Sequence, residues 1–213
     1  MKKILFLIFA LSVCIGTIHA DIVFTLGNNP QPGEENILLN SGETGTTVMG
    51  TPSGFPSFVV DFMSTQTLLA PSSGQARVSG DPEGTPLTDM TISLENGATY
   101  GDLIINPFIG GCSACVSGTG TVTVNAVDSM GVAEAPSVFS YPINNGNNFL
   151  TITTLNGERI VSTSISDMGS FNDLRQPRIS GLAAAAVPEP ATYAALLALA
   201  LGSIALRLRS RKV

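Results

Sequence analysis

Of the 213 residues, sixteen are acidic and ten are basic, and the long apolar runs are confined to the two ends of the chain. Fifteen of the acids but only four arginines lie between residues 21 and 186, a net charge of −11, which excludes nucleic acid as a main partner because a polyanion needs basic residues to replace its counterions. The single histidine, His19, precedes that stretch, which excludes a Ser-His-Asp triad, a Cys-His pair and a histidine-ligated metal site within it.

The first twenty residues predict a secretory signal peptide. Lys2 and Lys3 form a short basic region, residues 4–15 are an apolar core of the usual length, and Ala20 is the small residue that signal peptidase requires. An uncleaved membrane anchor is the alternative, but the apolar run is short for a bilayer span. We expect the secretion machinery to export the chain, signal peptidase to cleave after Ala20, and the rest to fold in an oxidising compartment.

Residues 21–186 predict one all-β domain, long enough to bury a sizeable core. Apolar and polar residues alternate there, a pattern that places one face of a strand on a core and the other in water. The alternating runs are 58–62, 90–94, 121–126 and 150–154. We expect a mainly antiparallel, jelly-roll-like β-sandwich of roughly eight to twelve short strands. A right-handed β-helix is the rival fold, but no repeat of fixed period is visible.

One pair of segments carries a specific pairing prediction. The dipeptide Asn156-Gly157, which is typical of tight two-residue turns, separates residues 150–154 from the apolar segment 160–165. This arrangement predicts a β-hairpin.

Cys112 and Cys115 lie in a Gly-flanked stretch and are the only cysteines after the signal peptide. A redox centre needs a βαβ frame and a group that lowers a thiol pKa, and the surrounding sequence offers neither. A zinc site needs further cysteine or histidine ligands, which are absent. We therefore expect a local disulfide between Cys112 and Cys115.

Two kinds of acidic site stay open on the residues alone. Asp81, Glu83 and Asp89 are a candidate calcium site because hard cations prefer clustered oxygen ligands, although an ordinary solvated turn is the favoured alternative. A glycosidase with two catalytic carboxylates is also open, but spacing in the sequence does not select the pair. The lack of Trp, and a domain with only two Tyr, disfavour the aromatic platforms of sugar sites.

Residues 187–213 predict a tail associated with a membrane. Pro188-Glu189-Pro190 precedes sixteen uncharged residues, 191–206, and four basic residues lie among the last seven. As a helix the sixteen would span about 24 Å, and the flanking arginines can extend their side chains to the interface. The basic residues predict a cytoplasmic C-terminus, with the main domain on the other side.

This order of triplet, short apolar helix and basic end resembles the PEP-CTERM sorting signal of Gram-negative bacteria that make exopolysaccharide. The resemblance implies that an exosortase recognises Pro188, Glu189 and Pro190, and that the tail is removed as the protein moves to the cell surface or the extracellular matrix. Ala191, where serine is common in the family, is a mild departure.

A second similarity covers residues 169–181, together with 73–77 and 146–150, and points to a group of exported PEP-CTERM proteins without an assigned activity. It supplies no reaction. Arg175 and Arg178 lie in this stretch, and in so acidic a domain we expect them to pair with carboxylates.

These observations favour an exported protein that passes through a form anchored in the inner membrane to the cell surface or extracellular matrix, where it is structural or adhesive. We assign it no catalytic residue and no cofactor. Exosortase is the expected partner, and extracellular polysaccharide is a further candidate. The alternatives are a carbohydrate-active enzyme that uses two carboxylates, and a module that binds carbohydrate or calcium.

Overall fold

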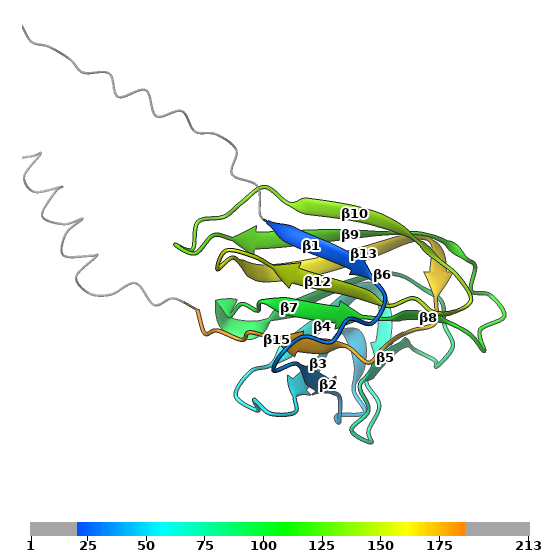
Figure 1. Ribbon diagram of the computed structural model, residues 1–213. Coiled ribbons are helices and arrows are strands. Elements are labelled where there is room, and N and C mark those ends of the chain that lie inside the picture. Colours follow the sequence, from blue (N-terminus) through cyan, green and yellow to red (C-terminus); the bar gives the residue numbers. More distant parts are fainter. Residues whose placement is uncertain (1–20, 186–213) are drawn as a thin grey trace, which may run out of the picture.

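The alternating runs form the strands of an all-β domain (Figure 1). This computed structural model describes residues 21–185, and within that range the only helical element is the short 3-10 turn η1 (Glu95–Gly97). The predicted signal peptide, the triplet Pro188-Glu189-Pro190 and the predicted helix 191–206 lie outside the described residues.

Fifteen strands make up the domain, more than the eight to twelve expected, because the chain also forms several strands of only two or three residues. The fifteen are β1 (Ile22–Leu26), β2 (Glu35–Leu38), β3 (Thr44–Pro52), β4 (Val60–Leu69), β5 (Arg77–Gly80), β6 (Leu87–Leu94), β7 (Asp102–Ile105), β8 (Pro107–Ile109), β9 (Gly118–Val127), β10 (Ser137–Ile143), β11 (Gly146–Asn147), β12 (Leu150–Thr154), β13 (Arg159–Phe171), β14 (Asp173–Arg175) and β15 (Arg178–Ser180).

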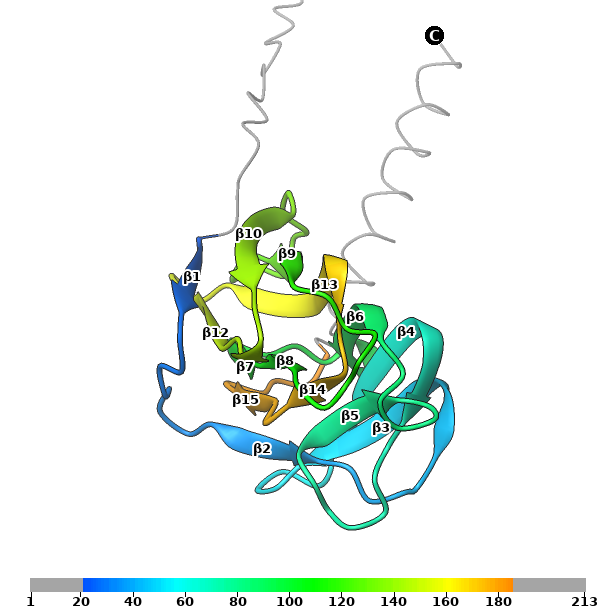
Figure 2. The same cartoon turned by 90° about the vertical axis from the view of Figure 1, so that its right-hand side faces the viewer.

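The strands pair antiparallel throughout and belong to one continuous sheet that folds over on itself. Seen from the end, β1, β12, β7, β15 and β2 stand in one layer, while β10, β9, β13, β6 and β4 stand opposite (Figure 2). The pairing of β2 with β3, and of β3 with β4, connects the layers, and β5, β14, β8 and β11 continue the sheet from β4. The predicted all-β, antiparallel class is confirmed, whereas the jelly-roll comparison stays a prediction.

The core lies between the two layers and is built by the alternation seen in the sequence. On β6, Met90, Ile92 and Leu94 are buried, and on β9 Val122 and Val124 are fully buried. Burying an aliphatic side chain of this size contributes about 1.5–3 kcal/mol, which is the main stabilising term for such a sheet. The prediction that these faces point to the core is confirmed.

The predicted hairpin between residues 150 and 165 is wrong. The turn itself forms, because Asn156 and Gly157 have φ values of 54° and 82° and the Glu158 N–H donates to the Leu155 carbonyl at 3.0 Å. However, β12 pairs with β1 and β7, while β13 pairs with β6 and β9 in the opposite layer. The chain therefore crosses the edge of the domain here, and the two segments face each other across the core.

The domain begins and ends at the same end of the molecule (Figure 1). The Leu155 N–H donates to the Asp21 carbonyl at 3.1 Å, which fixes the start of β1 beside the turn after β12. After β15, Ala183 forms a β-bridge with Thr99. We call the end that holds Asp21, the turn at 155–158 and the segment 181–185 the exit end.

Candidate functional site

The segment that leads out of the domain is fixed by backbone and side-chain contacts. Thr99 and Ala183 exchange two backbone hydrogen bonds of 2.9 Å each. The guanidinium of Arg159 donates to the Thr99 hydroxyl and carbonyl, both at 3.2 Å, and also to the Gly181 carbonyl. Gly181 has φ +61°, and a Cβ there would lie 3.1 Å from the Gly101 nitrogen, so this close approach requires glycine. The chain is thus held in place until shortly before the sorting triplet.

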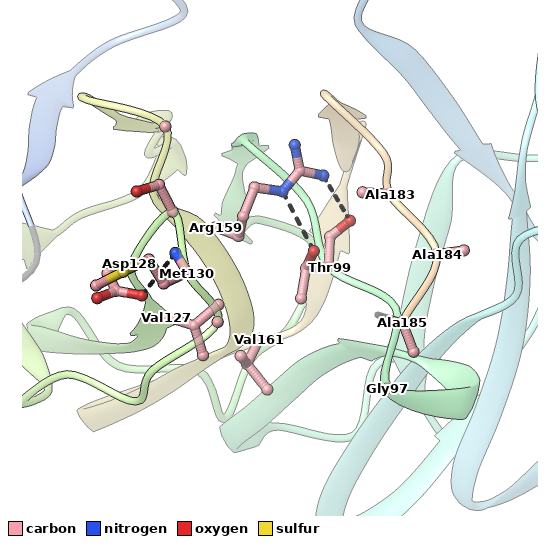
Figure 3. A pocket seen from close by; sticks show the side chains of 13 residues that line it. Gly97, Thr99, Val127, Asp128, Met130, Arg159, Val161, Ala183, Ala184 and Ala185 are labelled. Atoms are coloured by element: carbon pink, nitrogen blue, oxygen red, sulfur yellow. Dashed lines mark hydrogen bonds between the residues drawn. The ribbon is translucent and has the colours of Figure 1, made fainter. Parts of the chain in front are cut away.

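A pocket of about 520 Å³ opens beside this segment (Figure 3). Its lining comes from four parts of the chain: the turn after β6, the turn after β9, the start of β13 and the residues after β15. Burial lowers the pKa of Arg159, and the nearby Asp102 offsets part of this effect. Nothing in the local sequence around Thr99 or Arg159 indicates this pocket, because its walls meet only when the two layers close.

The chemistry available in this pocket is narrow. Asp128 uses Oδ1 to accept the backbone N–H groups of Met130 and Val132, both at 2.8 Å, so its carboxylate holds its own turn. Ser129 and Thr99 supply the hydroxyls of the lining; the Thr99 hydroxyl accepts from Arg159, and no His, Lys or Cys is among the described lining residues. A serine hydroxyl needs a neighbouring base to become a nucleophile.

The expected pairing of arginines with carboxylates is confirmed. Arg175 donates through Nε and Nη2 to the two oxygens of Asp173 at 2.8 and 3.0 Å. Arg178 pairs with Glu34, 144 residues away along the chain. A two-point contact of a guanidinium with a carboxylate fixes both groups, so Arg175 is held in one orientation.

The two cysteines lie together as expected. The sulfur atoms of Cys112 and Cys115 are 2.26 Å apart, at disulfide distance, and the Cα atoms are 5.4 Å apart. Cys115 packs against the hydrophobic core, so the pair ties a surface turn to the domain.

The calcium candidates have separate roles. Glu83 pairs with Arg77, while Asp89 accepts hydrogen bonds from the backbone N–H and the hydroxyl of Thr65. Among residues 21–185 no group of three or more Asp, Glu, His or Cys side chains is placed to hold a metal ion. The fold therefore does not bring Asp81, Glu83 and Asp89 together as one such group.

Two pairs of carboxylates are close enough to influence each other. Burial raises the pKa of Asp61, and Glu95 adds to the rise. Burial likewise raises the pKa of Asp173, with a small contribution from Glu83. None of these four acids lines the pocket at the exit end.

Comparison with known proteins identifies the tail. Residues 186–212 match the family model of the PEP-CTERM protein-sorting motif. This motif implies an exosortase as processing partner, and it implies export with surface or membrane-associated sorting. The match begins directly after the described domain and covers no part of it.

No protein of curated function matches the chain. Within residues 21–185, no helix is long and apolar enough to cross a membrane. The predicted span over 191–206 lies outside that range and stays a prediction.

Proposed function

We propose that the chain is an exported protein whose tail is processed by an exosortase and whose residues 21–185 are displayed as a structural or adhesive β-domain. The observation that carries this proposal is the sorting motif at residues 186–212, which begins three residues after Ala183, the last residue paired in the described domain. The β-domain is then the part that acts at the cell surface or in the extracellular matrix.

The fixed exit segment supports a display role. Ala183 is paired with Thr99, so only two residues separate the last backbone pairing of the domain from the first residue of the motif. A sorting motif that begins so close to the folded domain leaves the domain as the part that is displayed once the tail is processed.

The described pockets and acids support a role without catalysis. The described lining of the pocket at the exit end has no His, Lys or Cys; its one carboxylate, Asp128, accepts two backbone N–H groups, and Arg159 donates to backbone carbonyls. The interacting carboxylates Asp61 and Glu95 lie outside it. Release of new reducing ends from extracellular polysaccharide by the purified full chain would instead favour the two-carboxylate glycosidase.

The sorting step is tested with Glu189→Ala in a host that has an exosortase, with both prolines kept. An epitope in the domain is followed by cell fractionation. We expect the parent at the surface and the variant retained as full-length protein in the inner membrane. Glu43→Ala, which removes a glutamate from the domain, is the matched control and should sort normally.

Normal surface delivery of Glu189→Ala would overturn the proposal. The triplet would then only begin a helix, and the tail would be an ordinary membrane anchor.

A further inference from the structure

A second pocket lies at a different place in the sheet and has a different chemical character. It measures about 530 Å³, and we call it the arginine groove. It lies where β2, the start of β5 and the residues after β14 meet. The lining residues are Asn36, Leu38, Gln75, Ala76, Arg77, Arg175 and Gln176.

The arginine groove has positive side chains in its lining, although the domain as a whole is acidic. Residues 21–185 contain fifteen acids and four arginines, yet the groove has two arginines and no acidic side chain in its lining. Arg77 and Arg175 are directly opposite each other on the antiparallel strands β5 and β14. Like charges in such positions repel each other unless a counter-charge lies between them.

Two carboxylates outside the lining supply that counter-charge. Glu83, whose side chain is 61 % exposed, pairs with Nη2 of Arg77. The second carboxylate is that of Asp173. Its side chain is only 2 % exposed, it binds Arg175 through both oxygens, and its Oδ2 lies 3.8 Å from Nη1 of Arg77. The Arg175 guanidinium also lies over the Phe108 ring, with its carbon 3.4 Å from the ring centre. One carboxylate and one aromatic ring thus fix the guanidinium of Arg175 before any ligand arrives.

The two arginines keep hydrogen-bonding capacity. Nη1 of Arg175 makes no hydrogen bond to another described residue, and Nη1 of Arg77 lies 3.8 Å from Asp173, which is too far for a hydrogen bond. A guanidinium presents five N–H donors in a plane, which suits a carboxylate that accepts at two oxygens. The unused donors therefore fit a carboxylate ligand.

Gln176 adds a strained backbone and an amide. Its φ is 48°, a conformation uncommon for a residue other than glycine, and its N–H is held by the Ala76 carbonyl at 2.7 Å. Strain of this kind costs of order 1–3 kcal/mol and concentrates at functional sites. Together with Asn36 and Gln75, Gln176 gives the groove three amides, which both donate to and accept from hydroxyl groups.

We propose that the arginine groove binds an acidic saccharide, with Arg77 and Arg175 on its carboxylate and the amides on its hydroxyls. The domain's net negative charge does not prevent this, because charges more than about 8 Å apart are largely screened at physiological salt. The proposal goes beyond the sorting function, which operates whether or not the groove is occupied.

The test is calorimetric titration of the purified full chain with a trimer of galacturonic acid. We expect saturable binding that weakens at least about tenfold between 50 and 500 mM NaCl, because surface charge attraction is screened by salt. Cellotriose, a neutral trimer, should bind at least about tenfold more weakly, because it lacks the carboxylates that an arginine pair recognises.

Two variants locate the site. Arg77→Gln should reduce affinity about tenfold or more, because it removes one guanidinium while Arg175 keeps its contact with Asp173. Gln176→Gly removes the side-chain amide, and glycine adopts a positive φ without strain. This variant should therefore weaken binding without lowering the melting temperature. Arg178→Gln removes an ion-paired arginine outside the groove and should leave binding unchanged.

Three outcomes would overturn the proposal: no saturable binding of the galacturonate trimer, equal binding by Arg77→Gln, or equal binding of penta-glutamate, which would point to a peptide ligand. Surface delivery of the Arg77→Gln variant, measured separately, shows whether sorting is intact and keeps a failure of binding distinct from a failure of sorting.

Discussion

Thr99 and Ala183 exchange two backbone hydrogen bonds, and the Arg159 guanidinium bridges the carbonyls of Thr99 and Gly181 beside them. Ala183 is therefore part of the folded domain, and this small cluster lies three residues before the sorting motif begins.

Removing the Arg159 side chain should loosen that point. In Arg159→Ala the two carbonyls lose a charged donor, and hydrogen bonds to charged groups contribute about 1.5–3 kcal/mol. We expect the Ala183 amide to exchange its hydrogen at least about tenfold faster, measured by hydrogen exchange with mass spectrometry on the full chain. Arg77→Ala, far from the exit end, is the control, and an equal increase in that variant would contradict a local role for Arg159.

A buried hydroxyl pair should be visible as a coupling energy. The Tyr100 hydroxyl donates to Oγ1 of Thr163 at 2.9 Å, and both residues are fully buried. Burial raises the pKa of Tyr100 well above its usual range, so the donor stays protonated. Tyr100→Phe and Thr163→Val should each lower the free energy of unfolding by about 1–3 kcal/mol. The first leaves the Thr163 hydroxyl without its donor, and the second leaves the Tyr100 hydroxyl only its longer hydrogen bond of 3.4 Å to the Ile92 carbonyl.

The double variant should lower the free energy of unfolding by less than the sum of the two single changes, because it removes both hydroxyl groups together. Urea unfolding of all four proteins measures this. Strictly additive costs would show that the two hydroxyls do not support each other.

The buried carboxyl of Asp173 should make stability depend on pH in a particular direction. Burial raises its pKa above the ordinary 3.8, and Arg175 and Arg77 offset only part of the rise. A raised pKa in the folded state means that the fold favours the protonated carboxyl. The resulting gain in unfolding free energy is complete below pH 3.8 and is lost as pH rises through the folded-state pKa. Relative to Asp173→Asn, the parent should therefore lose unfolding free energy over that pH range. A relative gain would mean that the arginines outweigh burial.

The disulfide should matter little for stability. Cys112 and Cys115 are only three residues apart, and closing so short a loop removes little entropy from the unfolded chain. The double variant with Ser at both positions should lower the melting temperature by less than about 8 °C, which corresponds to roughly 2 kcal/mol for a domain of this size. A larger fall in scanning calorimetry would show that the link to the core through Cys115 is structural.

The sequence predicted which face of the runs 58–62, 90–94 and 121–126 is buried, because alternation is a local property; in 150–154 the prediction was wrong for Thr151, which is fully buried beside Leu150 and Ile152. Met90 and Ile92 on β6, and Val122 and Val124 on β9, follow the pattern closely. The sequence did not predict which strands pair with each other. The turn at Asn156-Gly157 forms as expected, yet β12 and β13 enter opposite layers, because an alternating strand can bury its apolar face from either side of the core.

The sites also divide into those with a local sequence signal and those that depend on long-range pairing. The close spacing of Cys112 and Cys115 and the order of the tail motif are local signals, and they were predictable. Arg77 and Arg175 are nearly one hundred residues apart in the sequence and become neighbours only when β5 pairs with β14. The arginine groove therefore had no sequence signal beyond the scarcity of positive charge in an acidic domain.

The position of β15 determines when the domain can fold. This last strand does not lie at an edge but fills the space between β7 and β2. Until residues 178–180 have been synthesised and have crossed the membrane, both neighbours present open edges, and open edges invite pairing with other chains. A chain stalled before Arg178 would thus be prone to aggregate, and the domain completes its sheet only when the sorting motif is the next segment to arrive.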